Sequence, residues 1–517
     1  MLGLEPALND TVPALLRTAA ERFGDHPAYV EGDSVLSYTD LLSRVEATAA
    51  AYAEAGVGVG DRVVLWGPNS TDWAVAALAV SYAGGVLVPV NSRYVGHEVA
   101  DVVARTWAAL VVVHDGFLGR DQVAELADAG VTERVVPLEA MTHVDGPGDS
   151  KVRETLPRVG PDDVADILFT SGTTGRSKGA MSAHRQTIGV ARAWAELGGV
   201  RQDDRYLVVN PFFHSFGYKI GIVVGLLTGA TLYPVATFDV DATMRLIESA
   251  RITVFPGAPT LYQSLLNAPG RAERDLSSLR LAVTGAAVVP VVLIERMRTE
   301  LAIDQVVTAF GMTEAVVVTM CRDGDSAETV ATTNGRAIPG METRIDSRGG
   351  TVGNGQSGEL LVRGDYVMLG YLDDPDATRE AIDDDGWLHT GDIGSLDEHG
   401  NLRITDRLKD MYISGGFNVY PAEVEQALAR LDGVADVAVV GVPDERMGEV
   451  GRAYVVRSED STITEEDVIR FAKERLANFK VPRQVAFTDA LPRNPAGKVL
   501  KTALRGSQAR TSGTAGD

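Results

Sequence analysis

The chain has 517 residues, more than one hydrophobic core usually supports, so we expect two or more domains. Hydrophobic residues make up 45% and charged residues 23%, an ordinary globular composition, and the net charge of −23 argues against sequence-independent binding of nucleic acid. A single cysteine, Cys321, excludes internal disulfides and a cysteine metal cluster. We see no signal peptide pattern and expect a soluble, cytoplasmic protein.

Short apolar runs alternate with helical patterns along most of the chain. The apolar runs predict strands at residues 62–66, 86–90, 109–113, 167–169, 206–210, 231–235, 253–255 and 281–284, with helices between them, for instance at 38–54 and 240–249. Strands separated by helices are typical of βαβ units and largely parallel sheets. The uncharged run at 73–90 is long enough for a membrane span, but Gly84 and Gly85 interrupt it, which favours a buried helix followed by a buried strand.

The pattern changes at residue 358, where alternating segments at 359–363 and 402–404 predict a smaller β-rich subdomain. A compact unit follows, for which we predict helices at 421–431 and 465–477 and strands at 435–442, 451–457 and 485–488. The second helix begins with a capping box of Thr464 and Asp467 and has a single apolar face. We therefore place domain limits at 1–408 and 409–505, and expect a disordered tail at 506–517.

Residues 170–179 read Thr-Ser-Gly-Thr-Thr-Gly-Arg-Ser-Lys-Gly and directly follow the predicted strand at 167–169. Glycines let backbone N–H groups approach an anion, hydroxyls add hydrogen-bond donors, and Lys178 supplies a positive charge. The segment is not a Walker A loop, because Ser177 rather than a glycine precedes the lysine. A flexible linker seldom follows a buried strand directly, so we favour a polyphosphate-binding loop.

Four further segments carry polar residues in apolar surroundings. Glu314 follows the apolar run at 305–309 and offers a hard oxygen ligand that suits Mg²⁺. Asp392 can accept hydrogen bonds from two ribose hydroxyls, and Arg407 offers a further ribose or phosphate contact near the domain junction. Lys498 lies on a Pro/Gly loop near the C-terminus. Each residue alone has an ordinary explanation, since strand-end acids are usually caps and charged runs are usually solvated surface.

In this order and spacing, the five segments resemble those of the adenylate-forming superfamily of acyl-CoA synthetases, adenylation domains and beetle luciferases. The resemblance covers almost the whole chain. It implies an α/β fold, with a large N-terminal domain of stacked, mostly parallel sheets and a small mobile C-terminal α+β domain. It also implies that a carboxylate attacks ATP to give an acyl-adenylate and pyrophosphate, and that the thiol of coenzyme A then displaces AMP. ATP, Mg²⁺ and coenzyme A are the implied cofactors, and a small carboxylic acid is the implied substrate.

The resemblance assigns roles to individual residues. The phosphate contacts it implies are Thr170, Ser171, Gly172, Thr173, Thr174, Gly175, Lys178 and Thr313. Phe310 stands where the family usually has an adenine-stacking tyrosine, and Gly285, Ala286 and Ala287 match the segment that passes along the adenine and the acyl pocket. Gly311 and Met312, in the same motif as Phe310, are further expected nucleotide-binding residues. Asp392 and Arg407 match the ribose ligands, Lys409 the hinge, and Gly415 and Gly416 the glycines beside the pantetheine tunnel. The catalytic candidates are Lys498, Glu314 and Thr170, with Glu314 as the metal ligand. Ser177 departs from the family, in which proline is commoner.

The acyl pocket of the family begins at the segment 210–219. The substrate candidates are His214, Phe216, Tyr218, Lys219 and Val316, with Gly285 and Gly311 as further pocket residues. A core histidine is the alternative explanation for His214. An aromatic pocket with a nearby lysine favours a compact polar acid over a long chain. Segments 167–179, 210–219 and 408–425 are also similar to the actinobacterial ligases of steroid catabolism. That similarity implies HIP, the propanoate that keeps steroid rings C and D, as the acid.

Three alternatives stay open. The first is a medium-chain or aromatic acyl-CoA ligase, and the second is an adenylating enzyme that loads a carrier protein. The third is a non-catalytic nucleotide-binding regulator, against which the presence of both Glu314 and Lys498 argues. The sequence identifies no base for the CoA thiol, and it leaves a homo-oligomer open.

Overall fold

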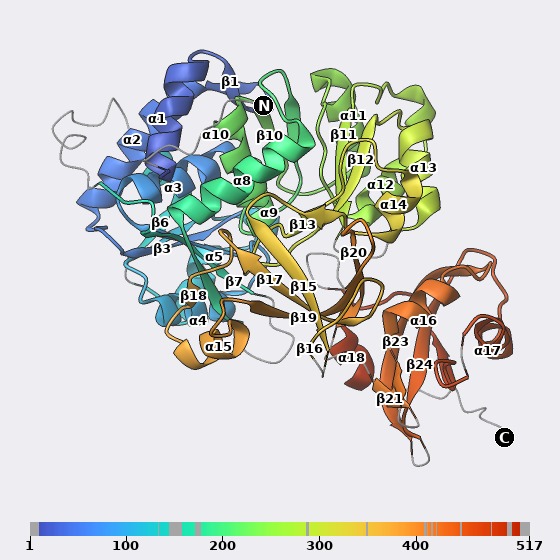
Figure 1. Ribbon diagram of the computed structural model, residues 1–517. Helices are drawn as coiled ribbons and strands as arrows, with labels where there is room; N and C mark the ends of the chain where they lie inside the picture. Colours follow the sequence, from blue (N-terminus) through green and yellow to red (C-terminus); the bar gives the residue numbers. More distant parts are fainter. Residues whose placement is uncertain are drawn as a thin grey trace, which may run out of the picture. The chain divides into compact units, whose positions relative to one another are not determined.

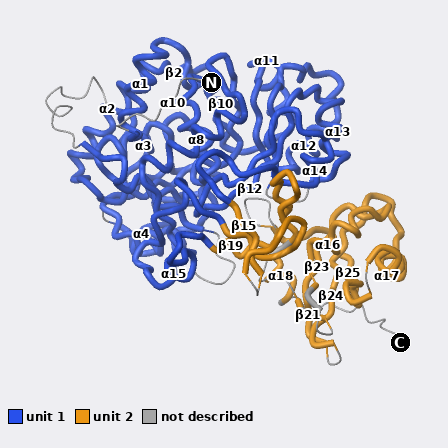
Figure 2. Tube along the Cα trace, in the orientation of Figure 1, with its two compact units in different colours: residues 1–285, 289–342, 362–388 blue, residues 286–288, 343–361, 389–517 orange. Residues whose placement is uncertain are grey.

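The computed structural model describes residues 10–132, 134–143, 158–170, 177–285, 289–347, 350–407, 410, 412–414, 417–419, 421–444, 447–476, 478–493 and 499–506. The chain forms two compact units (Figure 2). The first comprises Met1–Gly285, Val289–Glu342 and Val362–Leu388, and the second comprises Ala286–Val288, Thr343–Leu361 and His389–Asp517. The limits at 408 and 409 inferred from the sequence stay a prediction.

A seven-stranded sheet organises the first unit (Figure 1). Its order is β18 (Gly370–Tyr371), β8 (Gly179–Ala183), β7 (Val164–Phe169), β4 (Val86–Val90), β3 (Arg62–Trp66), β5 (Leu110–Val113) and β6 (Val135–Pro137). The five strands from β7 to β6 run parallel, whereas β8 is antiparallel to both β7 and β18. The central strands are valine-rich and buried on both faces, as parallel strands require.

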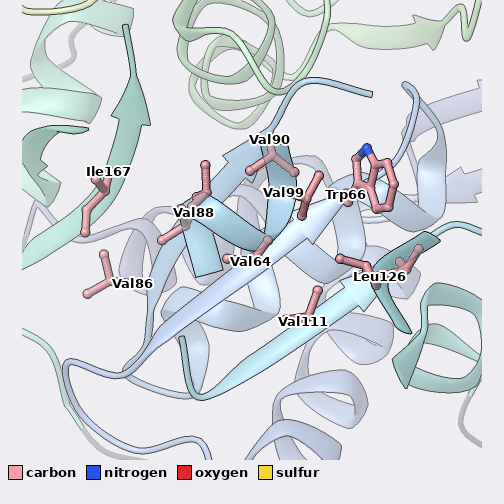
Figure 3. Close-up of a cluster of buried hydrophobic side chains, with 11 residues drawn as sticks. Val64, Trp66, Val86, Val88, Val90, Val99, Val111, Leu126 and Ile167 are labelled. Atoms are coloured by element: carbon pink, nitrogen blue, oxygen red, sulfur yellow. The ribbon is translucent and has the colours of Figure 1, made fainter. Parts of the chain in front are cut away.

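Helices pack against this sheet directly or through another helix. They are α1 (Val12–Phe23), α2 (Tyr38–Glu54), α3 (Thr71–Tyr82), α4 (Gly96–Thr106), α5 (Gln122–Asp128), α6 (Leu138–Thr142) and α8 (His184–Gly198), with a 3₁₀ turn at Phe117–Gly119. Helices α3, α4, α6 and α8 pack against the sheet directly, whereas α1 and α2 pack against α3. Val99 on α4 and Leu126 on α5 pack against Val64, Val88 and other strand residues in one apolar cluster (Figure 3). This burial of the valine runs explains why the strands could be located from hydrophobicity alone.

The apolar segment at 73–90 folds as predicted, with a buried helix, a glycine break and a buried strand. Ser70 caps α3 by accepting a hydrogen bond from the N–H of Trp73, and the helix ends at Tyr82. Gly84 then adopts a φ of 84°, a left-handed conformation that favours glycine, before β4 begins. In the described part of the chain, no helix has the length and apolar character needed to span a bilayer.

Two further sheets complete the first unit. One has the order β2 (Ser34–Ser37), β1 (Pro27–Glu31), β10 (Thr231–Pro234) and β9 (Arg205–Val208). The other has the order β11 (Leu281–Gly285), β12 (Gln305–Phe310), β13 (Thr319–Met320) and β14 (Arg336–Ala337). The prediction of a strand at 253–255 is wrong, because only Val254 pairs, as an isolated bridge to Tyr206 and to Leu281. One residue there links two sheets instead of extending either.

The helices between Ser215 and Ala381 range from one short turn to eleven residues. They are α9 (Ser215–Gly217), a π-helix at Tyr218–Val223, α10 (Val224–Thr228), α11 (Val240–Ala250), α12 (Pro259–Asn267), α13 (Val291–Glu300), α14 (Ala327–Thr332) and α15 (Pro375–Ala381), with a 3₁₀ turn at Arg271–Glu273. The predicted β-rich region is confirmed as a five-stranded sheet. Its order is β16 (Gly350–Thr351), β15 (Met341–Ser347), β17 (Gly358–Gly364), β19 (Leu388–Leu396) and β20 (Leu402–Arg407).

The C-terminal part of the second unit is an α+β fold. Its strands are β21 (Tyr412–Ser414), β22 (Phe417–Val419), β23 (Val434–Asp444), β24 (Gly448–Arg457) and β25 (Gln484–Phe487), and its helices are α16 (Pro421–Leu428), α17 (Glu465–Lys473) and α18 (Lys501–Gly506). The predicted capping box is confirmed, since the Thr464 side chain accepts from the N–H of Asp467 and the Asp467 carboxylate accepts from the N–H of Thr464. Val468 and Ala472 of α17 pack into a core with Val424 and Leu428 of α16. Of the expected tail, 507–517 lies outside the described residues.

Candidate active site

The predicted phosphate loop connects two antiparallel strands, β7 and β8. At its base, the N–H of Thr170 donates to the carbonyl of Lys178 at 2.8 Å. The N–H of Lys178 donates back to Thr170 Oγ1 at 3.2 Å. Ser171, Gly172, Thr173, Thr174 and Gly175 lie outside the described residues. The loop is therefore closed by a hairpin at its base, unlike a P-loop, which opens a helix.

Arg105, near the end of α4, supports this hairpin from a distant part of the sequence. Its Nη2 donates to the carbonyl of Ser177 at 2.7 Å, and its guanidinium lies 5.0 Å from the centroid of the Phe169 ring. A cavity of about 460 Å³ opens here. It is lined by Arg105, Phe169, Ser177, Lys178, Gly179, Leu372, Asp373 and Asp374. Two cations at the base of a glycine- and hydroxyl-rich loop suit a polyphosphate.

The turn after β12 carries the predicted metal ligand, Glu314. The N–H of Val318 donates to the carbonyl of Phe310 at 2.9 Å, which closes the turn. A Cβ at Gly311 would collide with the carbonyl oxygen of Val316, so glycine is required there. Val316 has a φ of 56°, a rare conformation for a β-branched residue and one that clusters at functional sites. Phe310, Met312, Thr313 and Glu314 are half-buried, and Gly311 is exposed.

Tyr371 on β18 joins this turn to the hairpin of β7 and β8 that carries the predicted phosphate loop, called the phosphate hairpin below. Its hydroxyl donates to Glu314 Oε1 at 2.8 Å, and Lys178 Nζ lies 4.9 Å from the centroid of its ring. The N–H of Met368 also donates to the carbonyl of Glu314, at 2.7 Å. Burial, together with the nearby Glu314 carboxylate, raises the pKa of Tyr371, so the phenol stays protonated and acts as a donor. The predicted phosphate ligand Lys178 and the predicted metal ligand Glu314 thus both contact a tyrosine that the sequence did not indicate.

The predicted acyl-pocket segment follows β9. His214 is exposed and caps the short helix α9, where its Nδ1 accepts from the N–H of Phe216 at 3.2 Å. The Phe216 ring packs edge-on against Trp194, with ring centroids 6.2 Å apart. Gly285 ends β11, and a Cβ there would lie 2.7 Å from the carbonyl oxygen of Ala309, so glycine allows the close approach of β12. Ala286 and Ala287 lie outside the described residues.

Tyr218 and Lys219 are both fully buried in the π-helix. Lys219 Nζ forms an ion pair with Asp166 Oδ1 of β7 at 2.9 Å and donates to Ser182 Oγ of β8 at 2.8 Å. Thr187 Oγ1 of α8 donates to the second carboxylate oxygen of Asp166 at 2.7 Å. These contacts account for the burial of Lys219 without a substrate, and the substrate roles of Tyr218 and Lys219 stay predictions.

The predicted ribose ligands lie on adjacent strands of the second unit. Asp392 of β19 pairs in register with Arg407 of β20. The Asp392 side chain is buried, and its N–H donates to Thr390 Oγ1 at 3.1 Å, while that hydroxyl donates to the carbonyl of Leu360 at 2.7 Å. The structure therefore brings together two residues 15 positions apart in the sequence. Lys409, Gly415, Gly416 and Lys498 lie outside the described residues.

This fold and these sites match a known family in two places. Residues 16–372 match the model of the AMP-binding enzymes, and residues 423–498 match that of the AMP-binding enzyme C-terminal domain. The protein therefore belongs to the AMP-binding enzyme family. The predicted fold class, with a large N-terminal and a small C-terminal domain, is confirmed.

Two relatives of similar sequence and one similar structure can be compared with the chain over almost its whole length. The chain is 56% identical over 516 residues to the 3-[(3aS,4S,7aS)-7a-methyl-1,5-dioxo-octahydro-1H-inden-4-yl]propanoyl:CoA ligase of Rhodococcus jostii (strain RHA1), covering 96% of this chain and 98% of that protein. It is 53% identical over 515 residues to the ligase of the same name from Mycobacterium tuberculosis (strain ATCC 25618 / H37Rv), covering 96% and 99%. The structure resembles that of ATP-bound MatB from Rhodopseudomonas palustris, with a TM-score of 0.87, 32% identity and coverage of 96% and 98%.

Proposed function

We propose that this protein is an ATP-dependent acid–CoA ligase that makes an acyl-CoA thioester through an acyl-adenylate, with the bicyclic propanoate HIP as its acid. One observation carries the proposal, namely the identity of 56% over 96% of the chain to a relative named as the CoA ligase of such a propanoate. The match to the AMP-binding enzyme family supports the adenylate route independently. We place the reaction in the cytoplasm, with no nucleic-acid partner.

The described residues fit the binding of a nucleoside triphosphate and Mg²⁺. Lys178 and Arg105 bring positive charge to a cavity of about 460 Å³ at the base of the phosphate loop. Glu314 offers a half-buried carboxylate whose position is fixed by Tyr371, and this residue would hold Mg²⁺. When bound, the ion supplies charge that offsets the negative phosphates.

The remaining work is mostly positioning and charge stabilisation. Phosphoryl-type transfer leaves the protein little covalent chemistry, so fixed charges and donors dominate. The acid is already ionised at neutral pH, and it can attack the α-phosphorus without a general base. We assign Lys498 to offset the negative charge of the entering carboxylate and the charge that develops on the phosphates. Asp392 and Arg407, which pair in register, hold the ribose.

A panel of acids, scored for AMP release with ATP, Mg²⁺ and coenzyme A, tests the substrate. We expect HIP to exceed palmitate in kcat/KM by on the order of 10- to 200-fold, because one ill-fitting group costs about 1–3 kcal/mol. Octanoate and an aromatic acid complete the panel, since medium-chain and aromatic ligases are the main alternatives. Palmitate turnover equal to that of HIP would refute the acid, although not the ligase activity.

Two further assays separate the remaining classes. Acid-dependent exchange of pyrophosphate into ATP would be absent in a non-catalytic nucleotide-binding regulator. Thioester formation on free coenzyme A would be absent in an enzyme that loads only a carrier protein. We expect both activities in the purified protein, and loss of either one contradicts the proposal at a defined step.

A further inference from the structure

Tyr371 is held rigidly between the metal-ligand turn and the phosphate hairpin. Strand β18 pairs with β8, with Gly370 opposite Met181 and Tyr371 opposite Ala180. The N–H of Leu372 donates to the carbonyl of Gly179 at 2.8 Å. The N–H of Tyr371 donates to Thr378 Oγ1 of α15 at 2.9 Å. These contacts fix the backbone of Tyr371 beside the strand that leaves the phosphate loop.

The segment of Tyr371 holds Glu314 by two separate hydrogen bonds. The main chain of Glu314 is fixed through the N–H of Met368, and its carboxylate is fixed through the phenol of Tyr371. The phenol donates to Oε1, and among the residues that the structure describes no side chain donates to Oε2, the oxygen that would bind a cation. Hydrogen bonds of this kind orient a metal-binding carboxylate, and their loss typically costs 10- to 100-fold in metal affinity or activity.

The other side of the tyrosine contacts Lys178. The ammonium group lies 4.9 Å from the ring centroid, within the range of a cation–π interaction. The aromatic face therefore fixes the lysine at the base of the phosphate loop. Phenylalanine would keep this contact and lose the hydrogen bond to Glu314, whereas leucine would lose both contacts. The two functions of the side chain can consequently be separated by substitution.

We propose that Tyr371 is a positioning residue that orients the Glu314 carboxylate for Mg²⁺ through its hydroxyl and places Lys178 through its ring. This inference rests on the proposed role of Glu314 as the metal ligand. Tyr371 acts through these two residues and does not itself contact the reacting atoms. Loss of its hydroxyl should therefore weaken metal binding, and loss of its ring should raise the KM for ATP.

The test compares Tyr371→Phe, Tyr371→Leu, Glu314→Gln and the double variant Y371F/E314Q. The direct readout is Mn²⁺ binding in the presence of a non-hydrolysable ATP analogue, measured by electron paramagnetic resonance. We expect Tyr371→Phe to raise the Kd for Mn²⁺ and the Mg²⁺ concentration for half-maximal AMP release by on the order of 10-fold or more. The KM for ATP at saturating Mg²⁺ should stay within about 3-fold, because Phe retains the ring beneath Lys178. Tyr371→Leu should raise this KM in addition.

Tyr366→Phe is the matched control, since Tyr366 is a half-buried tyrosine five residues away that lies against Gly189 and Gly340. We expect it to bind Mn²⁺ like the wild type. The double variant should be no worse than Glu314→Gln if Tyr371 acts through that carboxylate. Additive losses, or a Tyr371→Phe enzyme with unchanged Mn²⁺ and Mg²⁺ dependence, would overturn the role of Tyr371 while leaving that of Glu314 intact. A Glu314→Gln enzyme with wild-type turnover and Mn²⁺ binding would instead refute the metal role of Glu314, and the present inference with it.

Discussion

Replacement of Lys219 by methionine is expected to destabilise the first unit strongly. The side chains of Lys219 and Asp166 are 1% and 0% exposed, and their charged atoms lie 2.9 Å apart. Methionine fills a similar volume but carries no charge, so the Asp166 carboxylate would stay buried without a cation. Breaking a buried pair in this way costs about 3–5 kcal/mol, because the remaining charge is not solvated. We therefore expect Lys219→Met to lower the free energy of unfolding by about that amount.

The double variant K219M/D166N provides the control. Asparagine removes the second charge and keeps an oxygen that can accept from Thr187 Oγ1, as Asp166 Oδ2 does at 2.7 Å. It should recover most of the lost stability, because replacing both members of a buried ion pair is often nearly neutral. The free energies of unfolding can be measured by urea titration with tryptophan fluorescence as the signal, since the buried Trp194 lies on α8 together with Thr187. A loss below about 1 kcal/mol for the single variant, or equal losses in both, would refute the reasoning. A stable Lys219→Met protein with a raised KM for the acid would instead favour the substrate role of Lys219.

Three other changes test separate parts of the molecule. Burial lowers the pKa of His184 from 6.5 to about 4, and its Nδ1 accepts from the N–H of Val12 at 3.3 Å, so the folded protein keeps this ring neutral. As the pH falls below 6.5, the unfolded chain binds a proton at this histidine before the folded chain does. The contribution of His184 to the free energy of unfolding is therefore fully present above pH 6.5 and falls by about 3 kcal/mol as the pH falls to 4. His184→Gln should flatten this part of the pH–stability curve, and equal slopes in the two proteins would contradict the assignment. Arg105→Ala removes the hydrogen bond to Ser177 and should raise the KM for ATP in pyrophosphate exchange by about 10-fold. Arg105→Lys should recover this KM only in part, because lysine lacks the planar guanidinium fork. An unchanged KM would show that Arg105 does not shape the loop. We expect the small domain to rotate about Lys409 and so to present Lys498 for adenylation and the segment of Gly415 and Gly416 for thioester formation in turn. Lys498→Ala should then abolish adenylate formation yet let supplied acyl-adenylate react with coenzyme A, whereas Lys409→Pro, which fixes φ, should show the reverse. Equal loss of both half-reactions in the folded variants would argue against this rotation.

Hydrophobic patterning located the elements of the first unit well where burial is complete. The predicted strands at 62–66 and 86–90 and the helix at 38–54 match β3, β4 and α2 in both limits. Patterning was less reliable at partly exposed ends, since α16 ends at Leu428 and α17 at Lys473, both earlier than predicted. It also missed that β7 and β8 form a hairpin, because β8 consists largely of small residues that give no strong strand signal.

The candidate site was predictable to the extent that its residues lie in contiguous motifs. Thr170 and Lys178 meet at the base of one loop, and Glu314 lies in the turn that follows β12, so local sequence was informative. Arg105 and Tyr371 gave no comparable signal. Arg105 is 72 residues from its partner Ser177, and Tyr371 is 57 residues from Glu314. Contacts of this kind depend on strand order and helix packing, which a single sequence specifies only through the complete fold.

The net charge of −23 and a site for polyphosphate are compatible because electrostatic attraction in water acts over short distances. At physiological ionic strength, interactions between exposed charges are largely screened beyond about 8 Å. Lys178 and Arg105 both line the cavity at the phosphate loop, so a phosphate bound in this cavity would be influenced mainly by the charges that line it. Asp373 and Asp374 line the same cavity and would repel a bare polyphosphate. A nucleotide whose charge is partly neutralised by Mg²⁺ meets less of this repulsion, so the local charge pattern itself favours metal-bound ATP over the free nucleotide.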